Sequence, residues 1–234
     1  MKLNTNSNTY TILYATGVVV VVAFLLAFAY AALKERSDAN ERIDKKKQIL
    51  AALNIRNIDK SDIEERYKQV VLQDLIVTAK GDVKDEGKEQ DKAGFAVDRK
   101  DMNAENLPLY ICMVDGQKKY VLPMAGKGLW GGIWGFIALD EDGQTVFGAY
   151  FDHESETAGL GALIKDQPFQ NEFSGKQAYT ADGKPALSVV KSGAAKDAKH
   201  EVDGITGATL TSNGVRDMIT EYLGLYMNYI SKKQ

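Results

Sequence analysis

A run of small and hydroxyl-bearing residues, Asp203–Ser212 (DGITGATLTS), is the segment best suited to chemistry. It comes directly before a stretch whose apolar residues recur at helical spacing. Exposed backbone N–H groups and the positive end of a helix favour an anion, so the segment predicts a phosphate site. The same residues also fit a plain helix cap formed by Thr211, Ser212 or Asn213. The two interpretations are compatible.

Two glycine-rich segments upstream suit the close approach of a flat ligand. Gly159-Leu160-Gly161 follows Glu156-Thr157-Ala158, and glycines allow the backbone to approach a ring or a phosphate. Residues 126–134 (GKGLWGGIW) place two tryptophans in a second such run. Their rings fit either an aromatic ligand or the core, and for Trp134 we favour the core.

Most other chemistries find no support. His153 and His200 stand at unrelated positions, Cys112 is the only cysteine, and no cluster has metal-ligand spacing. The sequence has no Walker A loop, no G-x-G-x-x-G fingerprint and no G-x-S-x-G elbow. A net charge of −3 argues against a nucleic-acid partner. We therefore assign no catalytic residue and no metal ligand.

An apolar segment near the N-terminus predicts a membrane anchor. Residues 11–33 are almost wholly apolar, and no charged residue falls between Lys2 and Lys34. A helix needs about 20 such residues to cross a bilayer. The length, with a single basic residue before it, favours a retained anchor over a cleaved signal peptide or a buried soluble helix. The basic residues that follow weakly favour a cytoplasmic C-terminal part.

The region after the anchor predicts helices and then a loop. We expect helices from Lys34 to about Val77, with the second starting at a capping box that opens with Ser61. Residues 81–92 are almost entirely polar and predict a solvated loop rather than a functional charge cluster.

The second half of the chain predicts strands closed by a helix. Two hairpins are expected, the first around Asp115-Gly116 with a type I′ turn and the second over 133–151. Residues 185–191 suit a further strand, and an apolar face after Ser212 predicts a terminal helix.

Together these elements predict an α+β fold: a single N-terminal transmembrane helix followed by a domain with a mainly antiparallel sheet and flanking helices. The expected organisation is a short cytoplasmic tail at 1–10, the transmembrane helix at 11–33, a helical segment with a charged loop at 34–107, and the domain core at 108–234.

The hydroxyl-rich segment resembles the flavinylation motif of the FMN-binding domain family, written D-x-x-[ST]-G-A-[TS]. The matching positions are Asp203, Thr206, Gly207, Ala208 and Thr209. In that family a flavin transferase uses FAD as donor and joins FMN to the last threonine through a phosphoester bond. The resemblance therefore implies Thr209 as the acceptor, not Thr206 or Thr211, and an FMN-binding domain core over 108–234.

The central segment is similar to the C subunit of the sodium-translocating NADH:quinone oxidoreductase. That family shows G-x-G-L-W, G-F-I-A-L and E-T-P-G-L-G, and here Ala158 stands in place of the proline. The similarity covers nearly the whole chain, with residues 81–92 matched least. It implies that six further residues approach the flavin: Thr157, Gly159, Leu160, Gly161, Leu129 and Trp130. It also implies that Asp203 matters to the transferase.

The resemblance further implies an electron-carrying subunit that is not a complete enzyme alone. In that family, electrons pass from an iron centre to the FMN of the B subunit and end on a quinone, coupled to sodium export. The B, D and E subunits, in a membrane complex of six, would be its main neighbours. Family topology implies a single pass through the bacterial inner membrane with the flavin domain on the periplasmic side, against the weak charge argument.

Two alternatives stay open at this point. The G subunit of the Rnf ferredoxin:NAD oxidoreductase has the same anchor, motif and loop, although 128–130 and 135–139 favour the sodium pump. The second is a membrane-anchored binding or assembly module without a redox role, in which the hydroxyl-rich segment merely caps a helix.

Overall fold

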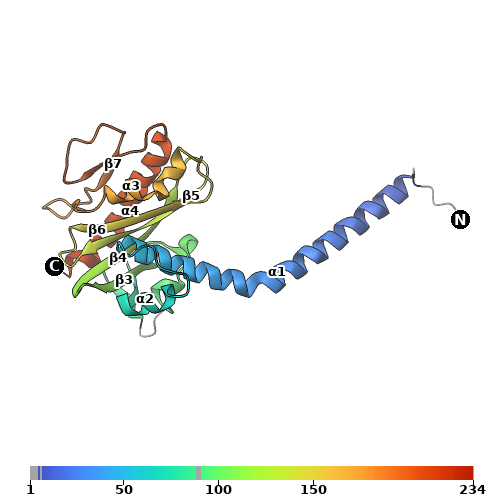
Figure 1. The fold of residues 1–234 in the computed structure, drawn as a ribbon, viewed down its shortest axis with the longest axis horizontal. Helices are drawn as coiled ribbons and strands as arrows, with labels where there is room; N and C mark the ends of the chain where they lie inside the picture. Colours follow the sequence, from blue (N-terminus) through green and yellow to red (C-terminus); the bar gives the residue numbers. More distant parts are fainter. Residues whose placement is uncertain (1–4, 6, 88–90, 234) are drawn as a thin grey trace. The chain divides into compact units, whose positions relative to one another are not determined.

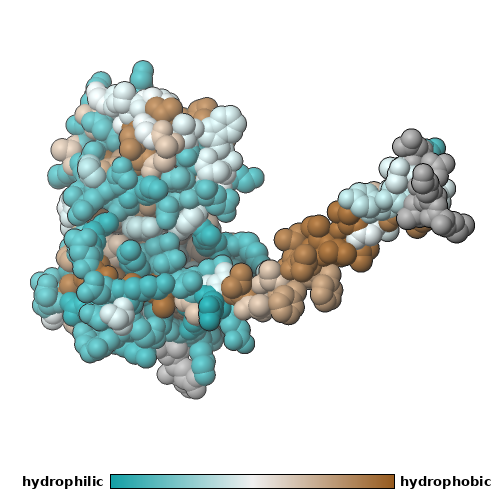
Figure 2. All heavy atoms as spheres, turned by 45° about the vertical axis from the view of Figure 1, so that its right-hand side comes forward, coloured by the Kyte–Doolittle hydropathy of each residue, from teal (hydrophilic) through white to brown (hydrophobic). Residues whose placement is uncertain are grey.

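The computed structural model describes residues 5, 7–87 and 91–233 and begins with one long helix, α1 (Asn8–Ala52; Figure 1). Its apolar side chains, Ile12, Phe24 and Leu33 among them, are exposed and form the hydrophobic band seen in Figure 2. The helix is long and apolar enough to cross a membrane. The predicted N-terminal apolar helix is confirmed, and its length and composition fit a transmembrane span.

The chain divides after Lys45 into two compact units, and the end of α1 belongs to the second one. Lys46 and the residues from Ile49 to Ala52 are buried there. A short helix, α2 (Ile63–Val70), follows. The helix that starts as an apolar span therefore ends as part of a folded core.

A six-stranded antiparallel sheet with the order β2-β1-β3-β4-β5-β6 forms the centre of the second unit. Its strands are β1 (Val71–Val77), β2 (Val83–Asp85), β3 (Leu107–Val114), β4 (Gln117–Lys127), β5 (Gly132–Asp140) and β6 (Val146–His153). Both predicted hairpins are present. Asp115 (φ 49°) and Gly116 (φ 76°) link β3 to β4 with positive φ at both central positions, as a type I′ turn requires.

The terminal helix, α4 (Thr209–Ser231), packs on one face of this sheet, on the same side as α3 and β7 in Figure 1. Its buried face includes Val215, Met218 and Ile219, which join the core built by alternate residues of β3, β4 and β5. The Tyr226 hydroxyl lies within hydrogen-bond distance of the carbonyls of Pro108 (2.6 Å) and Pro123 (3.0 Å). These contacts are buried, so the helix is fixed against two strands.

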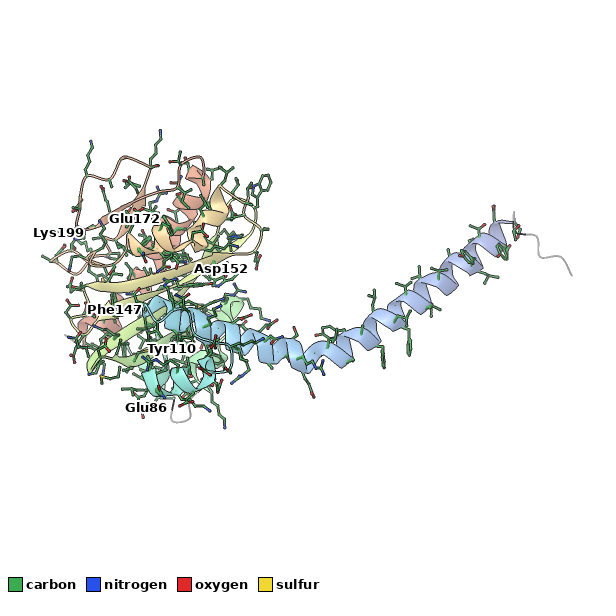
Figure 3. The ribbon with its side chains drawn as sticks, viewed as in Figure 1. Glu86, Tyr110, Phe147, Asp152, Glu172 and Lys199 are labelled. Carbon is green, nitrogen blue, oxygen red and sulfur yellow. The ribbon has the colours of Figure 1, made fainter. Side chains whose placement is uncertain are left out.

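The opposite face of the sheet is also buried. Tyr110, labelled in Figure 3, and Cys112 point to this face from β3 and are fully buried. Tyr67 of α2 meets Phe95 edge-on, with ring centroids 5.8 Å apart. The sheet therefore separates two packed layers.

The remaining elements are short and surround the sheet. A parallel pair, β7 (Ser188–Val190) and β8 (Glu201–Asp203), lies outside the main sheet and leads into α4. The others are η1 (Gly94–Ala96), η2 (Arg99–Asp101), η3 (Gly161–Lys165) and α3 (Gln167–Asn171).

The prediction of helix up to Val77 is wrong. Residues Val71–Val77 form β1, which pairs with β3 along its length. This run is rich in β-branched residues, and pairing with a distant strand outweighs the helical spacing of its apolar positions. The predicted capping box is also absent, because the Ser61 hydroxyl donates to Asp62 Oδ1 (2.8 Å) and α2 begins without a side-chain cap.

The predicted solvated loop over 81–92 is only partly correct. Val83–Asp85 form the edge strand β2. The Asp91 carboxylate lies 2.5 Å from Lys46 Nζ, and its side chain is only 11% exposed. Residues 88–90 lie outside the described residues. A polar sequence thus supplies one counter-ion to a buried lysine.

Candidate functional site

Thr209 is the first residue of α4, and its side chain is exposed. Ala208 occupies the N-cap position and no side chain caps the helix. The interpretation of Thr211, Ser212 or Asn213 as the cap is therefore wrong, since all three lie inside the helix. Uncapped N–H groups of a first turn and the helix dipole favour a negatively charged group.

The three threonines of the segment differ in what their hydroxyls do. Thr211 is 1% exposed and donates to Glu156 Oε2 (2.5 Å). Thr206 is exposed, and its hydroxyl lies 2.8 Å from that of Ser192. Among the described residues, none hydrogen-bonds the Thr209 hydroxyl. Thr209 alone combines exposure, an uncommitted hydroxyl and a place in the first turn.

Glu156 connects the three segments that form the site. It is 7% exposed, and its Oε1 accepts from the backbone N–H of Trp130 (2.8 Å) while its Oε2 accepts from Thr211. A Cβ at Gly161 would lie 2.5 Å from both Glu156 Oε2 and Thr211 Oγ1. Only glycine fits there, which explains one glycine of the sequence G-L-G.

The Glu156 carboxyl is held in its charged form by hydrogen bonds. Burial acts to raise its pKa, but the Thr211 hydroxyl and the backbone N–H groups of Trp130, Gly131 and Leu129 outweigh it and leave the pKa below its ordinary value. No lysine, arginine or histidine forms an ion pair with it in the described part of the chain. The site therefore contains one negative charge matched by neutral donors.

Four exposed apolar side chains surround this arrangement. Leu129 (48%), Trp130 (67%), Leu160 (42%) and Leu210 (59%) come from the three segments that Glu156 connects. Leu160 packs beside Gly207, whose Cβ would lie 3.0 Å from Leu160 Cδ2. Figure 2 shows hydrophobic residues gathered at the top of the larger unit, the end at which α4 begins in Figure 1. Exposed apolar groups of this kind suit a flat aromatic ligand.

The other residues expected at the site have mainly supporting positions. The Thr157 carbonyl accepts from the N–H groups of Leu160 and Ala162 (3.1 Å each) and shapes the loop. Asp203 Oδ1 accepts from the N–H groups of Ala194 (3.0 Å) and Ala195 (3.1 Å). Asp203 therefore holds the 192–195 loop beside the segment that ends in Thr209.

Trp134 is not part of the exposed apolar group. Its ring is stacked by the Arg99 guanidinium at 3.7 Å, and its Nε1–H donates to Gln48 Oε1 (3.1 Å). The core position favoured for Trp134 from sequence is therefore wrong, because the side chain is only half-buried and lies outside the buried core. Within the described residues no group of three or more His, Cys, Asp or Glu side chains could hold a metal ion.

Comparison with known proteins decides the family. The FMN-binding domain family matches residues 128–224, a range that contains all three site segments. The C subunit of the Na(+)-translocating NADH-quinone reductase from Haemophilus ducreyi is 31% identical over 239 residues, covering 95% of this chain and 92% of that protein. The chain belongs to this C-subunit family. The resemblance inferred from the sequence is confirmed.

Other relatives agree. The same subunit from Vibrio alginolyticus is 29% identical, covering 96% of this chain and 93% of that one. The crystal structure of the same subunit from Parabacteroides distasonis has a TM-score of 0.77 and 36% identity, covering 85% of this chain and 97% of that chain. Shewanella oneidensis NqrC shares the fold, with a TM-score of 0.70 at 23% identity, covering 83% of this chain and 98% of that chain. The predicted α+β fold is thus confirmed.

The residues present fit an FMN. Thr209 and the first turn of α4 suit its phosphate, and the exposed apolar side chains suit its ring. Glu156 and Leu210 were missed as site residues by sequence reasoning. Glu156 was visible beside the glycine-rich run, but nothing local showed that its carboxylate connects segments 26 and 55 residues away.

Proposed function

We propose that this chain carries FMN through a phosphoester bond to Thr209 and passes electrons through that flavin. The observation that supports the site is the exposed, uncommitted Thr209 hydroxyl in the uncapped first turn of α4. The resemblance to the family motif D-x-x-[ST]-G-A-[TS] supports the same residue as the acceptor. Thr211 is buried and bonded to Glu156, so its hydroxyl is a poor competitor.

Attachment requires a flavin transferase as partner and FAD as donor. The Thr209 oxygen attacks the phosphorus of the FMN half of FAD, a P–O bond to Thr209 forms, and the bond between the two phosphates breaks. AMP leaves, and the hydroxyl proton passes to a base of the transferase. The uncapped N–H groups of the first turn of α4 would stabilise the charge of a phosphate held at Thr209.

Bound FMN would supply one- and two-electron redox chemistry. The chain positions it: Thr209 fixes the phosphate end, and Leu129, Trp130, Leu160 and Leu210 provide an exposed apolar surface for the ring. A ring at the surface suits exchange with other subunits. We propose that it receives electrons from an iron centre and passes them to the FMN of the B subunit, supporting quinone reduction coupled to Na⁺ export.

The proposed setting is the bacterial inner membrane. The helix α1 anchors the chain by a single pass, and the flavin domain lies on the periplasmic side beside the B, D and E subunits, in a complex of six. Protease digestion of intact cells with a permeabilised outer membrane tests the orientation. A domain that stays protected until the inner membrane is broken would contradict it.

Intact-mass measurement tests the attachment. The full chain, produced with the transferase, is expected to gain the mass of one phosphoester-linked FMN. Thr209→Ala should lose the adduct completely, while Thr209→Ser and the control Thr206→Ala should keep it. An adduct that persists in Thr209→Ala would overturn the site, and a wild-type chain without any adduct would overturn the covalent flavoprotein proposal.

A further inference from the structure

The negative charge of Glu156 is not required by the hydrogen bonds that its side chain accepts. It is a carboxylate, 7% exposed, placed among neutral hydrogen-bond donors. A buried charge is costly unless it is paired, and an amide of the same shape could accept the same backbone N–H bond at lower cost. The described residues supply no cation to neutralise it. The chain therefore keeps a net negative charge inside its functional site.

The position of this charge ties it to the flavin. One carboxylate oxygen is bonded to Trp130 N–H, next to the exposed Leu129 and Trp130 side chains. The other is bonded to Thr211, two residues after the attachment point. The apolar surface for the ring and the anchor for the phosphate thus meet at the same carboxylate. A flavin tethered at Thr209 cannot occupy this surface without lying near the Glu156 charge.

We propose that Glu156 lowers the reduction potential of the bound FMN by placing a fixed negative charge beside it. The inference rests on the proposed function, because it needs a flavin at Thr209. Reduction of a flavin adds negative charge to its ring, and a nearby anion opposes that change. A unit charge about 12 Å away, at an effective dielectric constant of about 20, alters such an equilibrium roughly tenfold. This corresponds to about 30 mV for a two-electron couple.

Thr211 sets how strongly the charge acts. Its hydroxyl donates to Glu156 Oε2 at 2.5 Å and so offsets part of the negative charge. Removing that hydroxyl leaves the carboxylate less screened. Glu156→Gln and Thr211→Val therefore shift the potential in opposite directions, which distinguishes a field effect from a general disturbance of the site.

The test is spectroelectrochemical titration of the FMN in the purified full chain, near pH 8, after intact mass has confirmed one adduct per chain. Glu156→Gln should raise the midpoint potential by about 30 mV, and Thr211→Val should lower it. Glu154→Gln is the matched control, because Glu154 is an exposed carboxylate two residues away that accepts from Gly132 N–H (3.2 Å). Its midpoint should stay close to that of the wild type.

Each outcome decides the matter. A Glu156→Gln chain that carries the adduct with an unchanged midpoint overturns the inference and leaves the proposed function intact. If Glu156→Gln does not fold or does not gain the adduct, Thr211→Val decides: a lowered midpoint supports the inference, and an unchanged or raised one overturns it. A wild-type chain without the adduct overturns the proposed function, and the inference falls with it.

Discussion

Two buried charged side chains in this domain have opposite kinds of partner: Lys46 is surrounded by carboxylates, and Glu156 by neutral hydrogen-bond donors. Lys46, at the end of α1, is 1% exposed, and its ammonium lies 2.8 Å from Glu64 Oε2 and 2.5 Å from Asp91 Oδ2. It also lies over the Tyr67 ring at 4.8 Å. Glu156, at the candidate flavin site, is 7% exposed and is matched only by neutral donors.

We assign a structural role to the Lys46 charge and propose a role at the flavin site for the Glu156 charge. Around Lys46, the carboxylates of Glu64 and Asp91 neutralise the positive charge of the buried ammonium, and the effect of the cluster is to fix the end of α1 in the core. Around Glu156, dipoles stabilise the charge without cancelling it, and its field extends into the site. The comparison predicts that changes near Lys46 affect folding, whereas changes near Glu156 affect the flavin.

The largest expected effect on stability is at Lys46. Lys46→Met removes the ammonium that lies 2.5 Å from the mostly buried Asp91 carboxylate, and breaking such a pair costs about 3 kcal/mol or more. Urea unfolding of the full chain in mild detergent, followed by tryptophan fluorescence, measures the loss. Flavin attachment by the folded fraction should persist, because Lys46 has no contact with the flavin site.

Lys68→Met is the matched control for this prediction. Lys68 pairs with the same Glu64 at 3.5 Å, but both side chains are largely exposed, 59% and 47%. Exposed pairs of this kind contribute about 0.5 kcal/mol. If Lys46→Met and Lys68→Met unfold at the same urea concentration, the buried ion pairs of Lys46 do not stabilise the fold more than an exposed pair does, and the structural role assigned to Lys46 is wrong.

The second prediction uses two glycines of the same loop. Gly161→Ala forces a Cβ against Glu156 Oε2 and Thr211 Oγ1, which should cost about 2 kcal/mol and reduce flavin attachment. Gly159→Ala meets open space and is strained only by its φ of +74°, at about 1 kcal/mol. Unfolding and intact-mass yields measure both. Equal attachment in the two variants would show that the Glu156–Thr211 contact does not position Thr209.

Features that depend on neighbouring residues were predictable from the sequence, whereas features that depend on distant contacts were not. The hairpin at Asp115-Gly116 depends on two adjacent residues and was predictable, whereas β1 depends on pairing with β3 and was mistaken for helix. Thr209 was proposed as the acceptor through a motif. In the folded chain the Thr211 hydroxyl is hydrogen-bonded to Glu156, whereas the Thr209 hydroxyl has no such partner. This difference depends on the folded position of Glu156. The spacing of residues in the sequence does not show which partners the Glu156 carboxylate has in the folded chain.

A smaller effect is expected at Asp203. Its carboxylate holds the 192–195 loop through two backbone N–H groups, so Asp203→Ala should cost about 1 kcal/mol and slow attachment roughly tenfold. Asp203→Asn keeps an oxygen that accepts the same bonds and should behave almost like the wild type. Time courses of adduct formation measure this. If Asp203→Asn gains the adduct as slowly as Asp203→Ala, the transferase requires the negative charge of Asp203, and the position of the 192–195 loop does not explain the slower attachment.

The smallest expected effect is on the free energy of unfolding at low pH. The pKa of the Glu156 carboxyl is lower in the folded chain than its ordinary value of 4.5, because hydrogen bonds outweigh burial. Its contribution to stability is therefore complete above that ordinary value and is lost as the pH falls through the lower, folded one. Urea unfolding from about pH 6 to about pH 3 should show the stability of the wild type falling relative to that of Glu156→Gln as the pH is lowered, by less than about 1 kcal/mol. The pKa of Glu64 is lowered chiefly by its hydrogen bond to Lys46, so the wild type should also lose stability relative to Glu64→Gln in acid. A wild type that gains stability relative to Glu156→Gln in acid would mean that burial prevails at Glu156 and that the site does not hold a permanent charge.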